Sequence, residues 1–225
     1  MNRSLILSAC AVAMLPAAPL SADDIAPPWW RDKHPNHEIN RSTLQQWEFA
    51  AGLGNPLAEP GFLSPPSSVD PIAGVEPGST WIDDDPDSSR QGLWALTEDE
   101  SAGMINLFIS NYTDGPEKKI RIQLTWKPRP HILPPPEDGS PLISAFTNLS
   151  LIPVYAELLS ERPLAEDWIH SSYLIVVRPN PSSEIITLSG DILVDEVVVD
   201  TICPEPGTLL LLGAGVPFLA RARRR

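Results

Sequence analysis

Short apolar runs, separated by prolines and turn residues, recur along the chain from residue 44 to residue 203. In the clearest of them, residues 119–126, large apolar residues occupy alternate positions: Ile120, Ile122, Leu124 and Trp126. The residues between them, Arg121, Gln123 and Thr125, are polar. Because successive side chains of a strand point to opposite faces, this run predicts a strand with one buried face and one solvated face. Such strands are typical of antiparallel sheets.

Similar runs elsewhere predict further short strands. They cover residues 44–49 (a strand or a short helix), 79–82, 91–97, 103–110, 149–159, 167–178 and, as two strands around a turn at 189–191, 184–201. Pro153 predicts an edge strand or a bulge, because proline cannot donate a hydrogen bond to a central ladder. Residues 52–78 and 128–141 are rich in turn-forming residues and are expected to be loops. The order predicts an all-β fold, a single antiparallel β-sandwich that is jelly-roll-like.

Composition supports one ordered, acidic domain. The 26 prolines oppose long helices, and the 42% apolar content argues against a disordered chain. Residues 23–203 exclude Arg3, the four arginines of the last five residues, and Glu205. They contain 11 of the 16 basic residues and 28 of the 29 acidic ones, which gives a net charge of about −17. Such a surface repels nucleic acid. The two cysteines, Cys10 and Cys203, leave no internal disulfide for the body.

The first 22 residues have the three parts of a secretory signal peptide. Arg3 gives a positive start, residues 5–15 are apolar, and Ala22 is a small residue at the expected cut, with Ala18 as the alternative. Residues 7–10 (Leu-Ser-Ala-Cys) also fit a lipobox, but the apolar stretch before the cysteine is too short for a lipoprotein leader. The sequence therefore predicts export, with a signal peptide at 1–22 and a body at 23–202.

The last 23 residues, 203–225, form a tail in three parts. Pro204, Glu205 and Pro206 form a stiff extended segment, residues 207–220 are apolar, and the end is rich in arginine. The 14 apolar residues are short for a spanning helix, but the arginines would stay on the cytoplasmic side and hold it in the bilayer. The membrane segment and its anchor would include Leu209, Leu210, Leu211, Leu212, Phe218, Arg221, Arg223, Arg224 and Arg225.

The order of these three parts resembles the PEP-CTERM sorting signal of Gram-negative surface proteins. The resemblance implies that exosortase, a multi-spanning cysteine protease, recognises Pro204–Pro206 and removes or transfers the tail. The body would pass through the secretion machinery, stay at the inner membrane until processing, and then be released or attached at the surface of bacteria that make exopolysaccharide. A plain tail anchor is the alternative. Residues 27–31 and 46–49 also resemble the mature N-termini of a recurring group of PEP-CTERM surface proteins.

Two features of the body suggest a ligand. Exposed tryptophans stack on sugar rings, which makes Trp29, Trp30 and Trp81 candidates for a carbohydrate-binding module; Trp168 is a further member of the set whose exposure decides between stacking and core packing. Calcium prefers oxygen ligands, and four carboxylates lie within five residues: Asp83, Asp84, Asp85 and Asp87. Their spacing does not match a calcium-binding helix–loop–helix motif, so a solvated acidic turn is the favoured explanation and calcium the alternative.

No pattern of catalytic residues stands out. No serine has a nucleophile-elbow context, and His170 beside Ser171 and Ser172 is explained by a sheet surface. His34 and His37 are separated by Pro35 and lack a third ligand nearby. We therefore expect no enzyme activity, cofactor or metal. A structural or interaction role at the cell surface or in the extracellular matrix is expected, with a carbohydrate-binding module, bound to extracellular polysaccharide, as the alternative and a secreted hydrolase as the least favoured.

Overall fold

A computed structural model describes residues 42–49, 52, 72–98, 101–109, 112, 115–129 and 140–203. These residues form fourteen strands and no helix. The strands are β1 (Ser42–Trp47), β2 (Ile72–Val75), β3 (Thr80–Asp84), β4 (Gln91–Ala95), β5 (Thr97–Glu98), β6 (Ser101–Ala102), β7 (Met104–Phe108), β8 (Lys118–Pro128), β9 (Leu142–Thr147), β10 (Ser150–Tyr155), β11 (Glu157–Pro163), β12 (Ile169–Val177), β13 (Glu184–Ser189) and β14 (Ile192–Ile202). The leader and the sorting tail lie outside the described residues.

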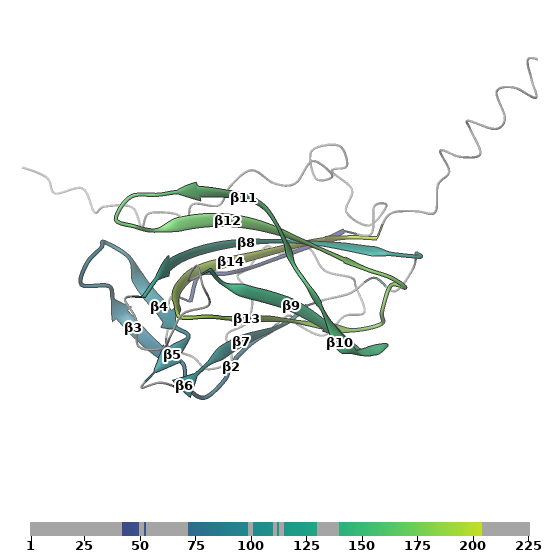
Figure 1. Ribbon diagram of the computed structural model, residues 1–225, viewed down its shortest axis with the longest axis horizontal. Coiled ribbons are helices and arrows are strands. Elements are labelled where there is room, and N and C mark those ends of the chain that lie inside the picture. The colour runs from purple at the N-terminus through teal and green to yellow at the C-terminus, as the bar shows by residue number, and fades with distance from the viewer. Residues whose placement is uncertain are drawn as a thin grey trace, which may run out of the picture.

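Two antiparallel sheets pack face to face, which confirms the predicted β-sandwich (Figure 1). The seven-stranded sheet has the order β11-β12-β8-β14-β4-β3, and β1 also pairs with β14. The five-stranded sheet has the order β10-β9-β13-β7-β2. A two-stranded ribbon, β5-β6, stands apart. The jelly-roll arrangement stays a prediction.

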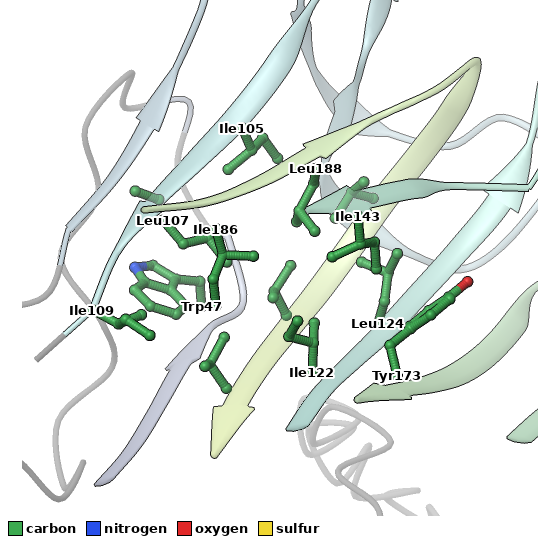
Figure 2. Packing of buried hydrophobic residues seen from close by; sticks show 14 of the residues in the cluster. Trp47, Ile105, Leu107, Ile109, Ile122, Leu124, Ile143, Tyr173, Ile186 and Leu188 are labelled. Carbon is green, nitrogen blue, oxygen red and sulfur yellow. The ribbon is translucent and has the colours of Figure 1, made fainter. Parts of the chain in front are cut away.

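The core lies between the sheets and follows the alternation seen in the sequence. Ile120, Ile122 and Leu124 of β8 are fully buried and face the side chains of the five-stranded sheet. Figure 2 shows apolar side chains of both layers meeting in one cluster, which includes Trp47. The predicted buried face of residues 119–126 is therefore confirmed.

The opposite face of β8 was predicted to be solvated, and this is wrong. Gln123 and Thr125 are only 2% and 1% exposed. β8 lies between β12 and β14, which place polar side chains beside it. Arg121 donates from Nε to Ser172 Oγ at 2.8 Å, and Thr125 Oγ1 lies 3.3 Å from His170 Nδ1. The polar character of these residues predicted exposure. In the middle of a wide sheet, however, polar side chains of a neighbouring strand supply hydrogen-bond partners, as Ser172 does for Arg121 and His170 for Thr125.

One predicted loop and one predicted strand also need correction. β2 lies inside the region 52–78 that we expected to be a loop, because a strand of four residues with a central glycine carries no readable alternation. The run 149–159 is a pair of strands, β10 and β11, that extends to Pro163. The register of β10 shifts between Ser150 and Val154, which confirms the irregularity predicted at Pro153.

Candidate functional site

With the exception of Phe108, the most exposed large apolar side chains of the described residues form one group along the sequence, on β9, β10, β11 and the turn between β9 and β10. We call it the apolar strip: Leu142, Phe146, Leu149, Leu151, Ile152, Tyr155, Leu158 and Leu159. Leu151 is 97% exposed, Ile152 76% and Tyr155 60%. Full burial of a large aliphatic side chain is more favourable than exposure to water by about 1.5–3 kcal/mol. Several such side chains left exposed near one another are therefore typical of a contact surface.

The topology explains why these side chains are exposed. β10 pairs only with β9, and β11 pairs only with β12, so each is the edge strand of its own sheet. Between them Ala156 donates its backbone N–H to Ile143 O at 2.9 Å. In Figure 1 the segment β10–β11 crosses diagonally from the five-stranded to the seven-stranded sheet. One nearly continuous stretch therefore provides an edge to both sheets.

The outer face of the five-stranded sheet continues this apolar surface. Ile185 of β13 lies in register between Phe108 of β7 and Phe146 of β9. Phe108 is 42% and Phe146 39% exposed. The next row on the same face is polar, where Thr187 Oγ1 donates to Asn106 Oδ1 at 2.8 Å. This polar row lies between Phe146 and Leu142, which is four residues earlier on β9 and on the same face.

The acidic turn at 83–87 is tied into the fold by hydrogen bonds. The buried carboxylate of Asp85 accepts from Ser88 Oγ (2.6 Å), Asp87 N (3.2 Å) and Lys127 Nζ (3.2 Å). Burial raises the pKa of Asp85, but these hydrogen bonds and the Lys127 charge hold it below its ordinary value. Asp84 is exposed and accepts from Gln91 Nε2 at 2.7 Å.

Trp168, whose exposure the sequence left open, lies beside Ser88 of this turn and packs with Leu93, Ala95 and Leu193. Trp168 is fully buried and donates from Nε1 to Ser88 Oγ at 3.2 Å. The guanidinium of Arg90 lies 4.9 Å from its ring centroid and forms an ion pair with Asp195. The acidic turn thus acts as a structural clasp. Within the described ranges, no group of three or more His, Cys, Asp or Glu side chains is arranged to hold a metal ion.

The tryptophan arrangement does not form a sugar-stacking platform in the described part of the chain. Four tryptophans are buried: Trp47, Trp94, Trp126 and Trp168. The candidate Trp81 is half-buried, packs against the core, and donates from Nε1 to Phe49 O at 3.4 Å. Trp29 and Trp30 lie outside the described residues. A stacking site built from the described tryptophans is therefore not supported.

His170 and Ser171 do not form a pair of general base and nucleophile. His170 was expected on a sheet surface, but it is only 6% exposed, because it lies beside Thr125 in the middle of the sheet. Ser171 points to the opposite face, where its Oγ accepts from Trp126 Nε1 at 2.9 Å and donates to Glu161 at 3.1 Å. Consecutive strand residues point apart, so this histidine cannot activate that serine.

Sequence reasoning missed a buried charged pair at one end of the core. Lys118 begins β8 and Glu184 begins β13, and both side chains are 0% exposed and form an ion pair. Burial lowers the pKa of Lys118, although the charge and hydrogen bond of Glu184 oppose this shift. The signal in the sequence is that Lys118 extends the apolar alternation of residues 120–126, so that it shares their inward face.

The body ends beside this pair. Cys203 follows β14, is 1% exposed, and donates from its thiol to Tyr112 O at 3.2 Å. Asn180 Nδ2 donates to the same carbonyl at 2.8 Å. The predicted sorting residues Pro204, Glu205 and Pro206 and the membrane segment after them lie outside the described residues. The described residues contain no helix that is long and apolar enough to cross a membrane.

No protein-family model matches the sequence, and no curated protein resembles it significantly. The function must therefore be argued from the residues of this chain.

Proposed function

We propose that the chain is an exported protein of the bacterial cell surface or extracellular matrix, with a structural or interaction role linked to exopolysaccharide. The secretory leader at 1–22 and the three-part tail at 203–225 support export, temporary anchoring in the inner membrane and processing by exosortase. β14 runs to Ile202, so the body would place the sorting residues directly after its last strand. The hydrophobic tail would form the C-terminal helix in the bilayer.

The observation that carries the interaction role is the apolar strip. We propose that it contacts the same strip of a second copy of the chain. The body has a net charge of about −17, so two copies repel each other over most of their surface. The segment 142–163 is different, because it carries only Glu157, Glu161 and Arg162 as charged residues. Repulsion between copies is therefore weakest where apolar side chains are most exposed.

Anchoring would favour this contact. Tails held in one membrane confine the copies to a plane, which raises their effective concentration without any new contact. Pro153 and the register shift in β10 oppose simple extension of the sheet by a neighbouring strand. The two copies would therefore meet through side chains and not through a continuous hydrogen-bond ladder.

Substitution within the strip tests the interaction role. Leu151 and Ile152 are replaced together by Gln, and Asp83 and Asp84 are replaced by Asn as a control far from the strip. Sedimentation velocity of the purified protein should show a concentration-dependent dimer in the wild type and the control, and a monomer in the strip variant. A wild type that stays monomeric up to high concentration would rule out the self-contact.

Processing of the tail is tested separately in an exosortase-containing host. Glu205→Ala, or loss of the exosortase, should leave a full-length chain in the membrane fraction, whereas the control Thr208→Val should be processed normally. A plain tail anchor predicts that all of these chains, including the wild type, stay full-length and membrane-bound. Normal processing of Glu205→Ala would contradict the assignment of the sorting signal.

A further inference from the structure

The buried Lys118–Glu184 pair joins the two sheets at one end of the core. Lys118 belongs to β8 of the seven-stranded sheet and Glu184 to β13 of the five-stranded sheet. Lys118 has the inward parity of Ile120 and Ile122, and Glu184 has that of Ile186 and Leu188. The two side chains therefore meet in the space between the layers, 66 residues apart in sequence.

Burial makes the ionised form of this pair costly. Two charges that are moved out of water lose favourable hydration. The attraction within a buried ion pair often does not compensate for this desolvation cost. Transfer of one proton from Lys118 to Glu184 gives a neutral amine and a neutral carboxylic acid instead. Burial favours this direction, because it lowers the pKa of Lys118. A desolvated neutral amine is a nucleophile.

We propose that Lys118 and Glu184 condense into an intramolecular amide that links the two sheets covalently. The Nζ lone pair of Lys118 attacks Cδ of Glu184, and the Nζ–Cδ bond forms as the Cδ–OH bond breaks. One Nζ proton leaves with the hydroxyl group as water. No atom is oxidised or reduced, and no co-reactant is needed. The cross-link does not depend on the proposed surface role, only on the sandwich.

Three features of the site favour the reaction. The fold holds the amine and the acid in contact, and intramolecular reactions of well-oriented groups gain effective concentrations of about 10⁵–10⁸ M. The complete burial of both side chains excludes the water that would hydrolyse the amide. The amide is neutral, so its formation removes the two buried charges. From residue 23 onward Cys203 is the sole cysteine, so the cross-link would supply a covalent tie that no disulfide within this region can.

Peptide mapping by mass spectrometry tests the proposal on the purified, denatured full chain. We expect a branched peptide in which the segments carrying Lys118 and Glu184 are joined, with a mass lower by one water molecule than the sum of the two. Trypsin should not cleave after Lys118, because its amine is acylated. Two separate linear peptides, with cleavage after Lys118, would overturn the proposal.

Matched variants separate the covalent bond from the ion pair. Lys118→Arg keeps the positive charge but cannot condense, and it should return the missing water to the intact mass. Lys119→Ala removes the neighbouring lysine, which is 35% exposed and pairs with Glu117, and it should keep the branched peptide. A branched peptide that survives in Lys118→Arg, or that is lost in Lys119→Ala, would show that the cross-link lies elsewhere. If Lys118→Arg does not fold, the wild-type peptide map alone decides the question.

Discussion

The carboxylate of Asp85 shows how a single residue can look like a ligand and serve as a clasp. Its oxygens accept from Ser88, Asp87 and Lys127, and Ser88 in turn accepts from the buried indole of Trp168. A carboxylate that already accepts several hydrogen bonds is costly to release for a metal ion. The four acids of the turn could be read from the sequence as a group. Lys127, which donates to Asp85, and Trp168, which donates to Ser88, both lie far along the chain.

Asp85→Asn should destabilise the protein in a pH-dependent way. The pKa of Asp85 lies below its ordinary value of 3.8 in the folded state, so the ionised form is stabilised by folding. Its contribution is fully present well above pH 3.8 and is lost as the pH falls below it, through the lowered folded pKa. We expect the variant to lose about 1–3 kcal/mol of unfolding free energy at neutral pH and less near pH 2.

Urea unfolding across this pH range measures the effect. Asp84→Asn is the matched control, because Asp84 is exposed and its carboxylate accepts from the exposed side chain of Gln91. A difference between Asp85→Asn and the wild type that stayed constant down to pH 2 would contradict the role given to the charge.

At the scale of elements, the strand pair β10–β11 exposes apolar side chains on edge strands, and Pro153 protects β10 from pairing with strands of other chains. Leu151 and Ile152 are exposed on an edge strand, where unpaired backbone groups usually invite pairing with other chains. Pro153 lacks an N–H group and sits where the register of β10 shifts. The sequence located this irregularity, because proline cannot donate a hydrogen bond to a ladder wherever it occurs. It could not show that β11 changes sheets, since that depends on the partner strands.

Pro153→Val should turn the limited self-contact into open-ended association. Valine restores a backbone donor and favours a regular strand, so neighbouring chains can extend the sheet. We expect static light scattering to rise over time in this variant and to stay constant in the wild type. Ser150→Val, which adds an apolar side chain to the same strand without removing the proline, is the control. Equal scattering from both variants would show that apolarity, and not the missing donor, controls the edge.

At the scale of the whole molecule, charge and apolar surface are segregated. A net charge of about −17 surrounds a body whose contact strip is almost uncharged. This charge opposes association of two copies over most of the surface, and it opposes association least at the apolar strip. The sheets themselves are held by a core in which the alternate apolar residues of both layers meet (Figure 2).

Self-association should therefore strengthen with salt. The screening length falls from about 10 Å at 0.1 M to about 3 Å at 1 M ionic strength, which weakens repulsion between the acidic bodies. Apolar contact does not depend on charge pairing, so the dimer dissociation constant measured by sedimentation should fall as sodium chloride is raised. A dissociation constant that rises with salt would indicate attraction between charges and contradict the proposed contact.

The sequence by itself determined the strands whose apolar residues alternate, because the side-chain period of a strand is a local property. It also determined the edge at Pro153, and it predicts export and the sorting tail. Only the tertiary structure decided that Gln123, Thr125 and His170 are buried, that Trp168 is buried and bonded to Ser88, and that Lys118 meets Glu184. Burial and pairing depend on strands that are distant in sequence, and the spacing of residues along a chain carries no record of which distant strands will become neighbours.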